Sequence, residues 1–183
     1  MNGIAYALFD TPIGRCGIAW DERGIAALQL PEADDARTCR RMLRRLPDAR
    51  EEAAPPWVLE VEAHIVALLR GAAIELTDVA LDMERIPAFD RQVYDLARAI
   101  GPGLTLTYGE LAERLKEAKV EEPSVAQAVG AALGRNPFAI IVPCHRVIGA
   151  NGKTGGFSAH GGPATKRQLL EIESALLRGT LFE

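Results

Sequence analysis

A cysteine followed at once by a histidine and an arginine is the feature of this sequence best suited to do chemistry. Residues 139–151 read AIIVPCHRVIGAN, so Cys144 directly follows a proline. The apolar run before Pro143 is short and β-branched, which favours a buried strand over a helix. The strand must end at Pro143, because proline lacks the amide donor that a ladder needs. The pattern therefore predicts that Cys144 lies at a strand end, where its side chain can face a pocket.

His145 and Arg146, an imidazole and a permanent cation, could favour the thiolate form of Cys144, which is the nucleophilic form of cysteine. Neighbouring side chains in an extended chain point to opposite faces. Cys144 and His145 could therefore cooperate only if Pro143 forces a turn or a water bridges them. An inert core cysteine is the alternative interpretation, since cysteine is among the most buried residue types.

The composition is that of an ordinary globular protein. With 183 residues, 48% of them hydrophobic, the chain is long enough for one large domain or two small ones. It has no apolar run of transmembrane length and no signal-peptide pattern at its start, so we expect a cytoplasmic protein without a membrane partner. The three cysteines are an odd number without a close pair, which predicts neither a disulfide framework nor a metal site.

Charge is distributed unevenly along the chain. The formal net charge is −4, yet residues 123–170 contain no acidic residue and five basic ones: Arg135, Arg146, Lys153, Lys166 and Arg167. A basic segment in an otherwise acidic chain is compatible with nucleic-acid binding. A buried, glycine-rich stretch that simply excludes carboxylates explains the same pattern equally well.

The first half of the chain predicts an α/β unit with a small, mainly antiparallel sheet. Residues 4–30 show three short apolar runs separated by turn residues, which is typical of a β-hairpin or meander. We expect helices over residues 34–46 and 57–70, the second capped by Gly71, and a returning strand within residues 74–83. The character then changes to helices. We therefore expect a domain boundary that separates residues 1–85 from residues 86–183.

The second half predicts a helical domain. Residues 89–100 are amphipathic, and Thr107 with Glu110 forms a capping box before a helix over residues 108–117. The next helix starts at Pro123 or Ser124, with Ser124 and Gln127 as a second possible capping box. Two short helices joined by a turn are the outline of a helix-turn-helix, although other helix pairs are far commoner. A glycine-rich loop over residues 149–162 should fold over Cys144, and a helix over residues 166–177 should close the chain.

The motif IVPCHRV resembles the signature of the O6-alkylguanine-DNA alkyltransferases. Asn136-Pro137 precedes it, and the segments GKTGGFSAHGG and KRQLLEIE follow it. The likeness is close over residues 89–174 and loose over the first 85 residues. It implies that Cys144 irreversibly accepts the alkyl group from O6-alkylguanine in double-stranded DNA, with O4-alkylthymine as a further lesion. The resemblance also implies a winged-helix-like DNA-binding unit that enters the minor groove, and a monomer that acts once without cofactor or metal.

The resemblance also implies roles for individual residues. His145 would accept the thiol proton through a water, and Glu173 would orient His145. Tyr108 would contact the flipped guanine and supply a proton to the departing base. The other implied site residues recognise the guanine, line the pocket, join the helix-turn-helix to the PCHR turn or lie at the DNA: Val147, Ser158, Phe157, Asn136, Ala126, Gln127 and Arg135.

Three features of the chain depart from the family pattern. Gln127 stands where the family has an arginine that fills the gap left by the flipped base. Base extrusion or DNA affinity should therefore be weaker than in the family, unless Arg135 or another group substitutes. Residues 116–122 lengthen the loop between the two helices and add acidic side chains. Phe157 replaces the usual pocket tyrosine, so one hydrogen bond to the leaving base is lost. A lesion sensor that performs no chemistry and a Cys-His hydrolase or acyltransferase acting outside DNA remain the alternatives, and turnover would distinguish the latter.

Overall fold

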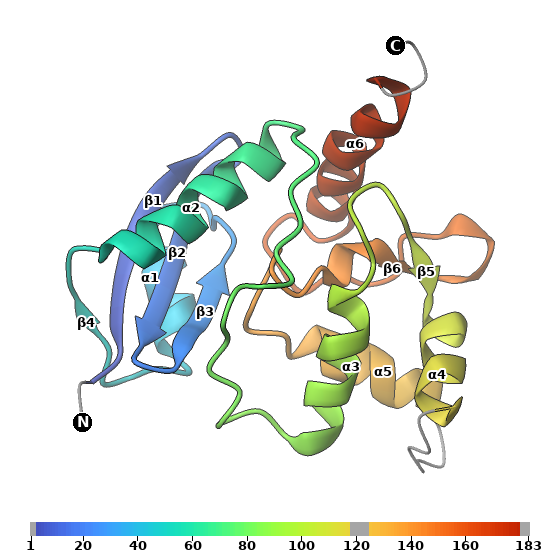
Figure 1. The fold of residues 1–183 in the computed structure, drawn as a ribbon, viewed down its shortest axis with the longest axis horizontal. Helices are drawn as coiled ribbons and strands as arrows, with labels where there is room; N and C mark the ends of the chain where they lie inside the picture. The colour runs from blue at the N-terminus through green and yellow to red at the C-terminus, as the bar shows by residue number, and fades with distance from the viewer. Residues whose placement is uncertain (1–2, 118–124, 180–183) are drawn as a thin grey trace.

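The computed structural model describes residues 3–117 and 125–179, which form a sheet-containing half and a helical half (Figure 1). The sheet contains β1 (Ala5–Thr11), β2 (Gly14–Asp21), β3 (Gly24–Gln29) and β4 (Arg50–Glu51), in the order β3-β2-β1-β4. The first three strands are antiparallel, and the short β4 runs parallel to β1. The prediction of an α/β protein with a mainly antiparallel sheet is confirmed.

One helix covers each face of this sheet (Figure 1), because side chains on a strand alternate between its two faces. Helix α1 (Asp35–Leu43) packs with Met42 against Ala19 and Ala27. Helix α2 (Pro56–Leu69) packs on the opposite face, which presents the larger side chains of the main core, such as Ile18. The small alanines on the first face let α1 lie close to the strands.

The segment after α2 does not form the expected strand. Residues 74–80 carry no strand, and Leu81 makes only an isolated bridge to Ile25. The Ile25 amide donates to the Ala80 carbonyl at 2.9 Å, and the Asp82 amide donates to the Ile25 carbonyl at 2.8 Å. The segment therefore contacts the edge of β3 at one point and continues towards the helical half.

Gly24 makes this contact possible, and its replacement by alanine should destabilise the protein. Gly24 has φ +143°, and a Cβ atom there would lie 2.5 Å from the Ala80 carbonyl oxygen. We expect Gly24→Ala to lower the free energy of unfolding by roughly 2–4 kcal/mol, measured by urea denaturation. Gly3→Ala is the matched control, because a Cβ at Gly3 meets nothing within 4 Å. Equal stabilities of the two variants would contradict this account.

The helical half is built from α3 (Ala88–Arg98), α4 (Tyr108–Glu117), α5 (Val125–Gly134) and α6 (Pro163–Gly179). The predicted capping box of α4 is present: Thr107 Oγ1 accepts from the Glu110 amide at 3.1 Å, and Glu110 accepts from the Thr107 amide at 2.7 Å. The Tyr94 hydroxyl joins α3 to α5 by donating to the Ala132 carbonyl at 3.0 Å. Ser124, the other predicted cap, lies outside the described residues. None of the described helices is long and apolar enough to cross a membrane.

The apolar run before Pro143 is a buried turn, so the prediction of a strand there is wrong. Ile140 has φ +70°, and the Ile141 amide donates to the Ala139 carbonyl at 2.8 Å, which is a γ-turn. The Val142 amide donates to the Phe138 carbonyl at 2.8 Å. These local bonds satisfy the donors that a sheet would otherwise have to satisfy, while the apolar side chains enter the core.

Candidate active site

Cys144 is presented by a turn and not by a strand end. Pro143 has φ −79° and ψ 66°, and the Cys144 amide donates to the Val142 carbonyl at 2.8 Å, so Pro143 centres an inverse γ-turn. The next residues form a short 3-10 helix, η1 (Cys144–Arg146). The turn at Pro143 that cooperation between Cys144 and His145 would require is therefore present. Cys144 itself is partly exposed, whereas His145 and Arg146 are buried.

Glu173 of α6 binds both of these buried side chains. Its Oε1 atom lies 2.8 Å from His145 Nε2 and accepts from Arg146 Nη2 at 2.8 Å, while its Oε2 atom accepts from Arg146 Nε at 2.9 Å. Arg146 also donates to the Ile100 carbonyl at 2.5 Å. The sequence suggested Arg146 as a partner of the Cys144 thiol, but its guanidinium is directed at the Glu173 carboxylate.

The protonation states of this buried group follow from its contacts. Burial raises the pKa of Glu173, but the hydrogen bonds from His145 and Arg146 outweigh it and lower the pKa to about 2. Burial lowers the pKa of His145 below its usual range, against the opposing influence of Glu173. A neutral His145 that donates from Nε2 to the carboxylate has its lone pair on Nδ1. That buried atom has no hydrogen-bond partner among the described residues, so it is the ring nitrogen able to accept a proton.

Lys166, on the first turns of α6, is the cation that acts on Cys144. Burial raises the pKa of the Cys144 thiol, whereas Asn136 and the charge of Lys166 lower it. Lys166 is fully buried and donates to the Val147 carbonyl at 2.6 Å. Its Nζ lies 5.6 Å from the centre of the Tyr108 ring and 6.0 Å from that of Phe157. Sequence reasoning missed this role, although a lysine within an acid-free stretch was a signal for it.

Replacing Lys166 should make the thiol harder to ionise. We expect Lys166→Met to shift the pH midpoint for alkylation of Cys144 by iodoacetamide upward by about one unit, because a nearby positive charge no longer favours the thiolate. The measurement is the rate of modification of Cys144 against pH, localised by peptide mass. Arg167→Met on the exposed side of the same helix is the control and should leave the midpoint in place. A midpoint unchanged in Lys166→Met would show that this charge does not reach the sulfur.

A short parallel ladder holds Tyr108 near this turn. Strand β5 (Leu106–Thr107) pairs with β6 (Val147–Ile148), directly after η1, and Tyr108 opens α4 immediately after β5. Burial raises the pKa of the Tyr108 hydroxyl, so it remains protonated at neutral pH. The glycine-rich loop passes close to the ring: Gly155 has φ +69°, and a Cβ there would lie 3.2 Å from a Tyr108 ring carbon.

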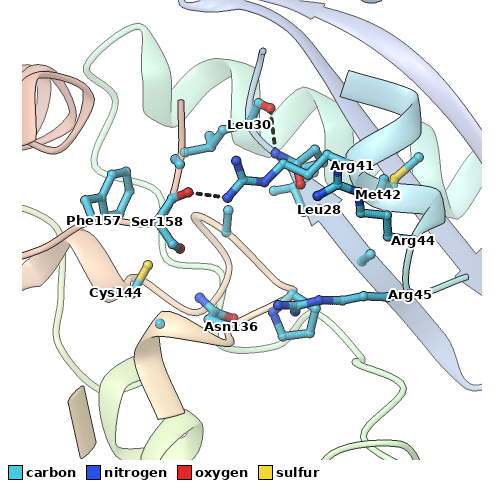
Figure 2. Close-up of a pocket in the computed structure, with 16 residues that line it drawn as sticks. Leu28, Leu30, Arg41, Met42, Arg44, Arg45, Asn136, Cys144, Phe157 and Ser158 are labelled. Atoms are coloured by element: carbon cyan, nitrogen blue, oxygen red, sulfur yellow. Dashed lines mark hydrogen bonds between the residues drawn. The ribbon is translucent and has the colours of Figure 1, made fainter. Parts of the chain in front are cut away.

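Two cavities share the wall formed by Phe157 and Ser158. The first, of about 650 Å³, brings several predicted site residues together with the α5 helix: Tyr108, Ala126, Gln127, Gly130, Leu133, Gly134, Phe157 and Ser158. The second, of about 390 Å³, contains Cys144 and Asn136 and extends to α1 and β3 (Figure 2). The loop residues Phe157 and Ser158 thus lie between the α5 helix and the sheet-containing half.

Asn136 and Arg135 follow α5 but have different partners. Asn136 donates from Nδ2 to the Val142 carbonyl at 2.8 Å and accepts from the Phe138 amide at 2.9 Å, which fixes the buried turn to the end of α5. Arg135 donates to both oxygens of the buried Asp90, at 2.9 and 3.1 Å. The guanidinium of Arg135 is therefore directed towards α3 and away from the residues that line the cavity at Tyr108.

The basic helix α1 reaches across to the site, which the sequence did not indicate. Arg41 donates to the Ser158 carbonyl (Figure 2) and also pairs with Glu32 at 2.9 Å. Arg45 donates to the Arg135 carbonyl just beyond α5. Two arginines of the sheet-containing half thus hold the glycine-rich loop and the end of α5. In the described part of the chain, no cluster of three or more His, Cys, Asp or Glu side chains could hold a metal ion.

A partly exposed cysteine directly after an inverse γ-turn, beside a buried histidine–glutamate pair, is the arrangement expected of a protein that uses a cysteine nucleophile. Comparison with known proteins identifies the family. Residues 88–175 match the family model described as "6-O-methylguanine DNA methyltransferase, DNA binding domain". A methylated-DNA–protein-cysteine methyltransferase of Methanosarcina acetivorans is 33% identical over 173 residues, which cover 93% of this chain and 98% of that protein. The chain belongs to the methylated-DNA–protein-cysteine methyltransferase family.

Two mycobacterial relatives extend the likeness over both halves. The methylated-DNA–protein-cysteine methyltransferase of Mycolicibacterium paratuberculosis is 37% identical over 175 residues, covering 93% of this chain and 92% of the relative. The crystal structure of Mycobacterium tuberculosis OGT in complex with DNA matches with a TM-score of 0.73 and 35% identity, covering 98% of this chain and 99% of that one. The sheet-containing half is therefore part of the shared fold, although its sequence resembles the family only loosely.

Proposed function

We propose that this protein reverses alkylation damage in DNA by moving the alkyl group from O6 of guanine to Cys144, each molecule acting once. The observation that carries the proposal is the η1 turn, which sets Cys144 next to His145 while Glu173 fixes His145 from α6. Relatives along almost the whole chain are named methylated-DNA–protein-cysteine methyltransferases, and a structural neighbour was crystallised with DNA. O4-alkylthymine is a second substrate under the same chemistry.

The transfer is a displacement at saturated carbon. The Cys144 thiol loses its proton through a bridging water to His145 Nδ1, and Lys166 stabilises the resulting thiolate. The sulfur then attacks the alkyl carbon, the S–C bond forms as the C–O bond breaks, and the electron pair leaves on O6 of guanine. The protonated Tyr108 donates a proton to the departing base, and the proton that His145 took from the thiol then passes to Tyr108 and restores its hydroxyl. The product is a thioether, which water does not hydrolyse under these conditions, so one protein is consumed for each lesion.

The remaining site residues are proposed to hold the extruded base. A base in a duplex must leave the stack before a pocket can read it. The Val147 backbone and Ser158 would recognise the guanine edge, and Phe157 would line the alkyl pocket. Asn136 would keep the Cys144 turn in register with α5. Ala126 and Gln127, both exposed on α5 beside the Tyr108 cavity, would face the DNA.

We further propose that residues 86–183 form the alkyltransferase and DNA-binding domain and residues 1–85 an N-terminal α/β domain. Helices α4 and α5 would act as a winged-helix-like helix-turn-helix in the minor groove, which suits a protein that must not read sequence. The ion pair of Arg135 with Asp90 makes Arg135 a poor substitute for the missing intercalating arginine. Gln127 would then fill the gap in the stack itself. We propose a monomer that acts in the cytoplasm.

The test is stoichiometry. The purified protein is incubated with an excess of duplex containing one O6-methylguanine, and its intact mass is followed. We expect a single gain of about 14 Da, the difference between H and CH3, on Cys144 and one repaired guanine per protein, as expected for a consumed thiolate. An undamaged duplex is the control. Binding without any gain in mass would favour a lesion sensor, and repeated release of product would favour a hydrolase.

A further inference from the structure

The cavity that contains Cys144 has a wall that methyl transfer does not use. Cys144 and Phe157 lie at one end, and α1 and β3 close the other (Figure 2). The sheet-containing half supplies three arginines to the lining, together with four apolar residues and Gln29: Arg41, Arg44, Arg45, Ala27, Leu28, Leu30 and Met42. With a volume of about 390 Å³, the cavity is much larger than one methyl group.

The arginines give this wall a surplus of positive charge. No aspartate or glutamate occurs among the residues that line the cavity. Glu32 pairs with Arg41, whereas Arg45 donates to the Arg135 carbonyl and pairs with no carboxylate in the described part of the chain. Arg44 is exposed and forms no ion pair within the described part of the chain. Two guanidinium groups therefore line the cavity without a carboxylate partner, at the end opposite Cys144.

A solvated basic face is the ordinary explanation for arginines on a helix, but two contacts argue against it here. Arg41 and Arg45 both extend from α1 to backbone carbonyls of the helical half, at Ser158 and Arg135. Both side chains line the cavity, so these contacts fix two guanidinium groups on its wall. A guanidinium held in this way presents donors in the fork geometry that matches a carboxylate.

We propose that this cavity receives the far end of alkyl groups larger than methyl and favours those that end in a carboxylate. The proposal rests on the proposed function, because it concerns the group attached to O6 of guanine. The methylene carbons would lie along Leu28 and Leu30, and the carboxylate would meet Arg44 and Arg45. The bond changes are those of methyl transfer: Cys144 sulfur bonds to the first carbon, the C–O6 bond breaks, and the carboxylate is carried unchanged onto the protein.

The experiment compares two lesions that differ only at the tip. One duplex carries guanine with a 3-carboxypropyl group on O6, and the other carries the matching carboxamide. We expect the wild-type protein to transfer the acid about two to five times faster than the amide in single-turnover mass measurements, the range of an exposed charge pair. Arg44→Gln should bring the ratio close to one, and Arg44→Glu should reverse it. Arg40→Gln, on the same helix but outside the cavity lining, should keep the wild-type ratio.

Other outcomes overturn the inference. If Arg44→Gln slows both lesions equally and weakens binding to an undamaged duplex, Arg44 contacts a DNA phosphate and does not select the alkyl group. If the wild-type ratio is one or less, the cavity does not favour the acid. If either of these results is found while the wild-type protein still repairs an O6-methylguanine duplex, the proposed function holds and only this inference fails. Absence of methyl transfer itself would remove both.

Discussion

Cys144→Ser is expected to bind a duplex containing O6-methylguanine as tightly as the wild-type protein and to transfer no measurable methyl group. Serine keeps nearly the same shape, but a hydroxyl does not ionise near neutral pH and is a far weaker nucleophile than a thiolate. The loss in single-turnover rate should be at least about a thousandfold, as for removal of a nucleophile that acts with other groups as a unit. The two measurements are the gain in intact mass and the equilibrium affinity for the lesion duplex.

The other two cysteines supply the controls for this result. Cys16 is fully buried, and burial raises its pKa to about 12, so it should not react. Cys39 is only partly buried, and burial together with Glu51 and Asp35 raises its pKa, so it too should remain a thiol. Cys39→Ser should therefore repair at the wild-type rate. A methyl group found on Cys39 in the Cys144→Ser protein would contradict the assignment of the nucleophile.

The elements that could be predicted from sequence are those specified by local signals. Alternating apolar residues and turn residues at Thr11–Gly14 gave the antiparallel strands, and the Thr107–Glu110 capping box gave the start of α4. The failures at residues 74–83 and 139–142 share a cause. The first mixes apolar and polar residues and the second is a β-branched apolar run, so both resemble strands, but their backbones are satisfied by single contacts with β3 or by local turns. Burial alone does not distinguish a strand from a turn packed in the core.

For the candidate site, sequence reasoning found groups that are close in the chain and missed partnerships that depend on tertiary structure. Cys144 and His145 are adjacent, and the family motif indicated Glu173. The direction of Arg146 towards Glu173, the burial of Lys166 and the reach of Arg41 to Ser158 all depend on how α6 and α1 pack. Long basic side chains have several possible partners, so their sequence positions do not reveal which one each meets.

Removal of Arg146 should cause the largest loss of stability among single changes near the site. Arg146→Met leaves the buried Glu173 carboxylate with His145 as its main partner, and breaking a buried pair in this way costs about 3–5 kcal/mol. The measurement is the free energy of urea unfolding at pH 7. Arg167→Met, on the exposed side of α6, should change it by less than about 0.5 kcal/mol. Equal effects of the two substitutions would mean that the ion pair between Arg146 and Glu173 contributes little to the free energy of unfolding.

The double variant Arg146→Met, Glu173→Leu separates stability from chemistry. Because it removes both buried charges, it should recover most of the stability that Arg146→Met loses. It should still repair slowly, since His145 no longer has a carboxylate at Nε2 to fix its tautomer.

The stability of the wild-type protein should fall at low pH because of Glu173. The lowered pKa of Glu173, about 2, adds stability that is present above its usual pKa near 4.5 and is lost as pH falls towards 2. The double variant should lack this acid-sensitive contribution, whereas in Arg146→Met the Glu173 pKa rises and the contribution should disappear at a higher pH than in wild type. A double variant as unstable as Arg146→Met would show instead that packing around α6, and not the unpaired carboxylate, causes the loss.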